Sequence, residues 1–221
     1  MLDIATLQGR FAGVLKDNLK SYDEIIGIDI NEKGIEAASE ANESGDVSFA
    51  VMNAEALEFE DEYFDTVAVS ASMHHMENLS TVLAEMKRVL KPGGRYIVLE
   101  MYRDDPSEQE STAIQMHQWA AEIDEAMGRY HRRTFTKSEI AENLAALDMT
   151  DVEEFDCPDP EPDPHNEDMF AHVDKAIEMV SERAKGLPGE DEFLERGRQL
   201  RERFRTVGAL REPLILVTGR K

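Results

Sequence analysis

Short apolar runs alternate with helix-like patterns along the first half of the chain. Runs of this length, rich in branched side chains and bounded by turn residues, predict buried strands. The predicted strands cover residues 1–4, 24–30, 47–52, 64–71 and 95–101. The segments between them carry apolar residues three and four positions apart, which predicts helices over 9–19, 31–41 and 79–90. Because this alternation is typical of βαβ units, it predicts an α/β fold with a mostly parallel sheet and helices on both faces.

The second half of the chain is richer in helical patterns. Helices are predicted over 107–127 and 136–147, strands over 151–157 and 213–218, and two amphipathic helices between residues 166 and 207. The acidic, proline-rich loop PDPEPDP precedes those two helices and is too rich in proline for a helix or a central strand. We therefore divide the chain into an α/β domain, residues 1–157 with 209–221, and a helical insertion, residues 158–208, before the last strand.

The two helices of the insertion each carry a single apolar stripe, and a stripe of this kind must be covered by another element. Two alternatives are open. The insertion could form a lid on the rim of a ligand pocket, or it could form a contact in a homodimer, since two-fold pairing is the commonest oligomer. We prefer the lid.

Composition narrows the classes of function. With 221 residues and 41% hydrophobic residues, the chain is long enough for one domain with a large core. The formal net charge of -23 disfavours binding to nucleic acid or to anionic lipid, and the excess of Asp and Glu over Lys is also typical of salt-adapted proteins. Cys157 is the single cysteine, which argues for a reducing, cytoplasmic environment. Neither a membrane span nor a secretory leader is predicted, and no metal site is predicted.

Two segments carry a family pattern. Residues 85–100 read EMKRVLKPGGRYIVLE, and the loop after the first strand reads Asp3-Ile4-Ala5-Thr6-Leu7-Gln8-Gly9. Together they resemble the class I S-adenosylmethionine-dependent methyltransferases, in particular the small-molecule branch that includes quinone-biosynthesis enzymes. The resemblance covers the chain to about residue 157 and resumes at the last strand. It implies a Rossmann-like, seven-stranded, mostly parallel sheet, with S-adenosylmethionine as cofactor, S-adenosylhomocysteine as product and a small-molecule acceptor as partner.

The loop after the first strand departs from the family pattern D-x-G-x-G-x-G. Asp3 and the last glycine, Gly9, are kept, whereas Ala5 and Leu7 stand at the first two glycine positions. Glycines in such a loop let the backbone approach a ligand at a helix N-terminus. The Ala5 change is mild, but the branched Leu7 side chain is predicted to stand where the methionine portion of the cofactor would lie.

Further cofactor-binding residues follow the next strands. Asp29 ends the second strand, where a carboxylate can accept both ribose hydroxyls of an adenosine cofactor; the other interpretation is an acid stabilised by a helix N-terminus. The segments 53–55 (NAE) and 70–76 (SASMHHM) resemble the family's adenine-binding segment and the loop beside the active methyl group. The complete predicted cofactor site is Asp3, Ala5, Leu7, Gly9, Asp29, Ile30, Asn53, Ala54, Glu55, Ser70 and His75.

Methyl transfer from a sulfonium needs no acid for the leaving group, so the protein mainly positions the acceptor and excludes water. A base helps when the acceptor is a hydroxyl or an acidic carbon. His75 is the first candidate base, although a position on a helix face or in the core is also open for it. Glu100, at the end of the fifth strand, is the second candidate.

Two other functions remain alternatives. One is a catalytically silent methyltransferase-like protein that binds a nucleoside ligand or a protein partner, which the substitutions at positions 5 and 7 motivate. The other is a nicotinamide-dependent dehydrogenase, which shares the acid after the second strand; the KPGGR turn and the NAE segment disfavour it.

Overall fold

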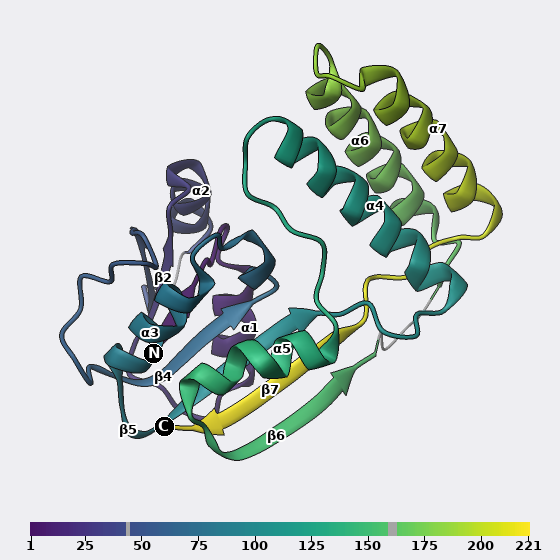
Figure 1. Ribbon diagram of the computed structural model, residues 1–221. Coiled ribbons are helices and arrows are strands. Elements are labelled where there is room, and N and C mark those ends of the chain that lie inside the picture. Colours follow the sequence, from purple (N-terminus) through teal and green to yellow (C-terminus); the bar gives the residue numbers. More distant parts are fainter. Residues whose placement is uncertain (43–44, 159–162) are drawn as a thin grey trace. The chain divides into compact units, whose positions relative to one another are not determined.

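The computed structural model describes residues 1–42, 45–158 and 163–221, and its elements are drawn in Figure 1. The chain forms two compact units. The first unit consists of Met1–Glu100, Ile140–Phe155 and Leu216–Lys221, and the second consists of Met101–Glu139 and Asp156–Ile215. Most of the predicted loop PDPEPDP lies outside the described residues.

The sheet has seven strands in the order β3-β2-β1-β4-β5-β7-β6. Their bounds are β1 (Leu2–Ile4), β2 (Ile25–Asp29), β3 (Val47–Val51), β4 (Phe64–Ser70), β5 (Leu90–Met101), β6 (Thr150–Cys157) and β7 (Leu214–Arg220). The first five strands pair in parallel. β7 runs in the opposite direction, because Lys221 pairs with Gly93 while Thr218, earlier in β7, reaches the carbonyl of Tyr96. The predicted α/β fold with a mostly parallel sheet is confirmed.

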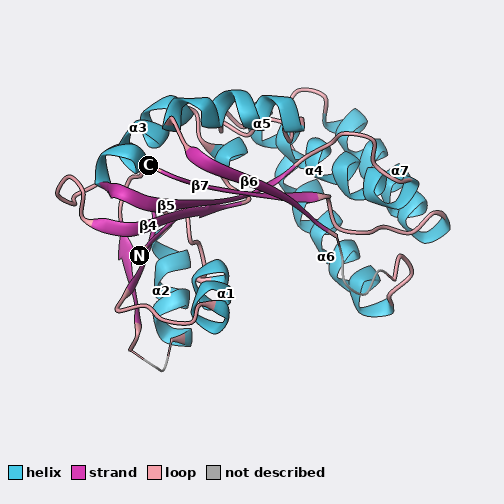
Figure 2. Cartoon of the chain, turned by 90° about the horizontal axis from the view of Figure 1, so that it is seen from below, coloured by secondary structure: helices cyan, strands magenta, loops and turns pink. Residues whose placement is uncertain are grey.

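Helices cover both faces of this sheet, with α1 and α2 on one side and α3 and α5 on the other (Figure 2). The helices are α1 (Arg10–Asn18), α2 (Glu32–Ala41), α3 (Leu79–Val89), α4 (Glu108–Ala126), α5 (Lys137–Leu144), α6 (Glu167–Ala184) and α7 (Glu190–Thr206). Local sequence explains several helix starts. Asn31 caps α2 by accepting from the Gly34 amide, and Ser107 with Glu110 forms a reciprocal capping box at α4.

The segment predicted as a glycine turn after α3 is part of a strand. Leu90 pairs with Phe64, and β5 therefore begins immediately where α3 ends, with a register irregularity before Arg95. Gly93 has a φ of 74° inside this strand, which only glycine adopts without strain. The glycines therefore shape the beginning of β5 instead of separating it from the helix.

A hydrophobic core lies between α1 and the sheet. Its buried members are Ala12, Leu15, Ile25, Val47 and Ala68. They come from α1 and from three strands, and Ile25 and Val47 are the first residues of β2 and β3. This core therefore packs α1 against the sheet.

In the second unit, α4 packs against both helices of the predicted insertion. Its buried core consists of Trp119, Ile123, Val173, Ile177, Val180, Ala184, Leu200, Phe204 and Ala209. Trp119 lies at the centre, and its indole N–H donates to the carbonyl oxygen of Phe193 at 3.0 Å. The argument that these stripes need a pocket rim or a second copy is therefore wrong, because α4 covers them within the same chain. The unit is correspondingly larger than residues 158–208.

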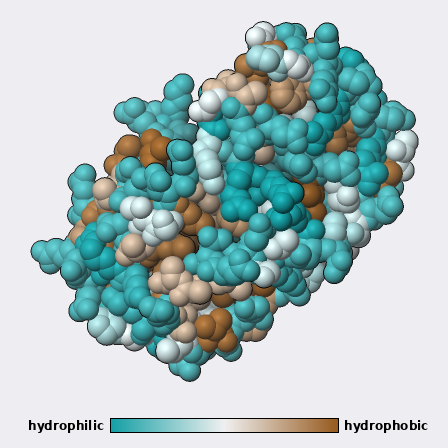
Figure 3. All heavy atoms as spheres, viewed as in Figure 1, coloured by the Kyte–Doolittle hydropathy of each residue, from teal (hydrophilic) through white to brown (hydrophobic). Residues whose placement is uncertain are grey.

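The surface reflects the acidic composition. Hydrophilic residues cover most of the face drawn in Figure 3, with hydrophobic residues scattered between them. Among the described residues, no helix has the length and apolar character needed to cross a membrane.

Candidate active site

The loop from β1 to α1 keeps a glycine-type backbone without the glycines. Ala5, Leu7 and Gly9 have φ values of 56°, 47° and 76°, all in the left-handed region. These are the three glycine positions of the motif predicted from the sequence. Left-handed φ costs about 1–2 kcal/mol at a residue with a side chain, so surrounding contacts must hold this path.

Asp29 supplies two of those contacts. Its Oδ2 accepts from the Leu7 amide at 2.9 Å, and its Oδ1 accepts from the Asn31 amide at 2.8 Å. One carboxylate at the end of β2 thereby joins the β1 loop to the start of α2. A carboxylate can accept about four hydrogen bonds, so each oxygen retains capacity for one more donor.

Two glycines leave room for the ring of Phe49 beside the loop. A Cβ on Gly9 would lie 2.6 Å from Phe49 Cζ, and a Cβ on Gly27 would lie 2.7 Å from Phe49 Cδ1. Gly9 is thus required twice, for its left-handed φ and for this close approach. This requirement explains why the last glycine of the motif is kept.

Asp3 is an acid inside the core of the first unit. Its side chain is fully buried; Oδ2 accepts from the Thr6 hydroxyl at 2.6 Å, and Oδ1 has no hydrogen-bond partner in the described part of the chain. Burial raises the pKa of Asp3 to about 7, and the Thr6 hydrogen bond opposes that rise. A buried carboxyl with an unused oxygen costs stability unless a donor or a cation reaches it.

The segment after β3 is organised by short side-chain contacts. The Asn53 side-chain oxygen accepts from the Glu55 amide at 2.9 Å. The Glu55 carboxylate in turn accepts from the Asn78 side chain, just before α3. Asn53 itself is exposed and lies shortly after the end of β3, next to Met52, whose amide donates to the Asp29 carbonyl.

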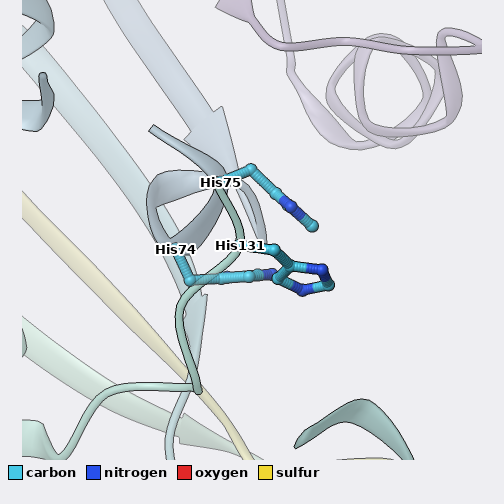
Figure 4. A group of neighbouring side chains, drawn as sticks. All are labelled: His74, His75 and His131. Atoms are coloured by element: carbon cyan, nitrogen blue, oxygen red, sulfur yellow. The ribbon is translucent and has the colours of Figure 1, made fainter. Parts of the chain in front are cut away.

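The turn after β4 carries two histidines with different surroundings. Both extend from the single turn Met73–His75, and their ring centroids are 4.2 Å apart (Figure 4). His74 is fully buried, with Nδ1 3.0 Å from Glu100 Oε1, while the other carboxylate oxygen of Glu100 accepts from the Met73 amide at 2.8 Å. His75 is exposed. Figure 4 also draws His131, which belongs to the second unit.

All of the predicted cofactor residues lie in the first unit, within the last residues of β1, β2 and β4 or in the segments that follow β1, β2, β3 and β4. Strand register places them side by side, because Ile4 pairs with Val69 and with Ile28, one residue before Ala5, Ser70 and Asp29 respectively. His74 was not predicted. The paired histidines in the sequence were the available signal, but only the turn geometry decides which of them is buried.

The second unit has its own polar cluster. His131 lies between Asp124 and His117, at 2.9 Å from Asp124 Oδ2 and 3.1 Å between the two histidine Nε2 atoms. Arg183 donates to the other oxygen of Asp124 at 2.8 Å. These contacts connect α4 and α6 to the segment after α4.

The first unit has the chemistry to hold an adenosine cofactor with a cationic centre. The unused Asp3 oxygen is a buried acceptor, and the Asp29 carboxylate lies beside a loop whose path suits close approach of a ligand. Since these groups converge at the carboxyl ends of parallel strands, they lie where α/β folds bind nucleotides.

This fold, with polar residues at the carboxyl ends of its parallel strands, is similar to known methyltransferases in sequence and in structure. Residues 2–98 match the family model described as a methyltransferase domain. Among curated proteins, the chain is 38% identical over 104 residues to the ubiquinone/menaquinone biosynthesis C-methyltransferase UbiE of Yersinia pestis. That match covers 45% of this chain and 41% of the relative, so it spans about two fifths of the length of the curated protein.

Solved structures agree on the fold. The YcgJ protein of Bacillus subtilis aligns with a TM-score of 0.62 at 21% identity, over 100% of this chain and 90% of that one. Phosphoethanolamine N-methyltransferase 2 of Haemonchus contortus, solved with S-adenosyl-L-methionine, aligns with a TM-score of 0.59 at 18% identity, over 100% of this chain and 48% of that one. The chain therefore has the fold of these structures, and its residues 2–98 are similar to a methyltransferase domain.

Proposed function

We propose that this chain transfers a methyl group from S-adenosylmethionine to a small-molecule acceptor and releases S-adenosylhomocysteine. The observation that carries the proposal is the Asp29 carboxylate, which holds the left-handed β1 loop and the start of α2 together at the carboxyl edge of the sheet. When bound, the cofactor supplies an electrophilic methyl group on a sulfonium centre.

The residues of the first unit take distinct binding roles in this proposal. Asp29 accepts the ribose hydroxyls with its remaining capacity, and Asn53 together with Ile30 contacts the adenine. Asp3 provides the buried negative charge that favours a cationic ligand. Ala5, Leu7 and Gly9 bring backbone close to the ligand, while Ala54, Glu55 and Ser70 complete the edge.

His75 is the proposed base for acceptors that must lose a proton. It is exposed and stands next to His74, which Glu100 fixes from inside the unit. Glu100 is the second candidate base, but both of its oxygens are occupied by the turn Met73–His75, which supports a positioning role for it. Because the relatives named above include C-methyltransferases, small molecules with a nucleophilic carbon are the first acceptors to test.

Calorimetric titration with S-adenosylmethionine and S-adenosylhomocysteine tests the binding part. Asp29→Ala should weaken binding by about 1.5–3 kcal/mol, the range for hydrogen bonds that involve a charged group. Asp65→Ala is the control, because Asp65 is an exposed acid on β4 that pairs with Lys91. Equal affinity of the Asp29 variant and the wild type would remove Asp29 from the site.

Measuring methyl transfer to acceptors distinguishes the proposed enzyme from a catalytically silent protein and from a dehydrogenase. His75→Ala should lower kcat with an acidic-carbon or hydroxyl acceptor by a larger factor than it lowers the affinity for S-adenosylhomocysteine. A protein that binds S-adenosylhomocysteine but methylates no acceptor in a broad panel would be the catalytically silent relative, and tight binding of NAD alone would identify a dehydrogenase.

A further inference from the structure

Leu7 adopts a conformation that its side chain disfavours, and a specific neighbour makes room for it. The nearest atoms to a Cβ built on Gly34 are Leu7 Cδ1 and the Leu7 carbonyl oxygen, each at 3.1 Å, followed by the Leu7 carbonyl carbon at 3.3 Å. The Leu7 side chain and peptide therefore lie directly on the backbone of α2, in a notch that exists because position 34 has no side chain.

Gly34 has no conformational reason to be glycine. It is the third residue of α2, and it is absent from the residues with positive φ. Glycine within a helix costs about 1 kcal/mol relative to alanine. The missing Cβ explains this residue, because the three nearest atoms that a Cβ would meet all belong to Leu7.

The notch is connected to the Asp29 contacts. The Gly34 amide donates to the Asn31 side chain at 3.0 Å, and the Asn31 and Leu7 amides both donate to Asp29. A shift of the Leu7 peptide away from α2 would lengthen its hydrogen bond to the Asp29 carboxylate. The same carboxylate would then lose part of its fixed orientation.

We propose that Gly34 is a positioning residue for ligand binding: it receives Leu7 and thereby lets a loop without its middle glycine keep the glycine-type path. This inference rests on the proposed function only for the identity of the ligand. The coupling between positions 7 and 34 is a property of the first unit alone.

The experiment compares the same substitution in two helices. Gly34→Ala should lower the denaturation midpoint in urea and weaken S-adenosylhomocysteine binding about tenfold, which corresponds to about 1.4 kcal/mol. Gly13→Ala in α1 is the matched control, because a Cβ there meets nothing within 4 Å. It should raise the midpoint through helix propensity and leave the affinity unchanged. Adding Leu7→Gly to Gly34→Ala should recover part of both losses, because it removes Leu7 Cδ1 and leaves the carbonyl group of residue 7 in place.

A second readout does not depend on the ligand. Hydrogen exchange of the residue 7 amide should accelerate at least tenfold in Gly34→Ala. In the double variant Gly34→Ala with Leu7→Ala, the exchange rate should return towards that of the wild type. If the wild type binds neither S-adenosylmethionine nor S-adenosylhomocysteine, the proposed function fails while this exchange result still decides the coupling. If Gly34→Ala behaves like Gly13→Ala in stability, affinity and exchange, the inference is overturned.

Discussion

Replacing Asp3 by asparagine should stabilise the ligand-free protein at alkaline pH and should do so less as the pH falls. The buried carboxyl of Asp3 has its pKa raised from 3.8 to about 7 by burial. Asparagine has nearly the same shape, and its side-chain oxygen can still accept from the Thr6 hydroxyl. The variant therefore removes the ionisation and keeps most of the packing.

The sign of the pH dependence follows from the raised pKa. The folded state binds the Asp3 proton more tightly than the unfolded state, so this residue favours folding fully below about pH 4 and loses that contribution as the pH rises to about 7. A shift of about 3 units corresponds to at most about 4 kcal/mol. Between about pH 5.5 and about pH 8.5, the stability difference between variant and wild type should grow by about 2 kcal/mol.

Urea denaturation followed by circular dichroism, at several pH values in that interval, measures this difference. The slope with pH is diagnostic, because an unsatisfied amide in the variant would shift its stability equally at every pH. Asp65→Asn is the matched control, since Asp65 is exposed and pairs with Lys91 across the surface. A difference between Asp3→Asn and the wild type that stays constant from acid to alkaline pH would refute the reasoning.

Other expectations concern the second unit and the surface charge. Trp119→Ala should lower the free energy of unfolding by about 3–5 kcal/mol, because the Trp119 side chain of α4 is fully buried against α6 and α7. Met179→Ala, on the exposed side of α6, is the control. A loss for Trp119→Ala below about 1 kcal/mol in urea denaturation would contradict this packing. Raising KCl from about 0.1 M to about 1 M should increase the denaturation midpoint, since the net charge of -23 repels itself and the Debye length falls from about 10 Å to about 3 Å. An equal rise with a neutral osmolyte at matched water activity would show that screening is not the cause.

The strands and most helices of this fold could be predicted because their signals are local. An apolar run in a parallel sheet and an amphipathic stripe at helical spacing are both visible in the residues themselves. The sequence does not show in the same way which element packs against the apolar stripe of a helix. Trp119 and the stripes of α6 and α7 were recognisable, but nothing in the sequence states that α4 covers both helices, and the predicted insertion was therefore too small.

The candidate site shows the same limit at the scale of single side chains. Asp29 is identifiable because its place at the end of β2 follows from the strand pattern. The difference between His74 and His75 is not, because a single turn of 3-10 helix turns one ring into the core and the next towards solvent. The role of Glu100 depends on which histidine is buried, because its carboxylate contacts the Met73 amide and the buried His74 ring.

The β1 loop carries a more general consequence for degenerate motifs. Its sequence has lost two glycines, and yet Ala5 and Leu7 occupy the left-handed region that those glycines would occupy. Because that conformation costs each residue about 1–2 kcal/mol in isolation, the path must be imposed by contacts elsewhere: the Asp29 carboxylate on the Leu7 amide, the Phe49 ring against Gly9, and the notch at Gly34. In this chain the loop adopts left-handed φ values at both substituted positions, and the glycine that makes room for Leu7 stands in the neighbouring helix. The missing glycines therefore argue less strongly against cofactor binding than the letters of the loop suggest, and the residues to examine are those that the loop touches.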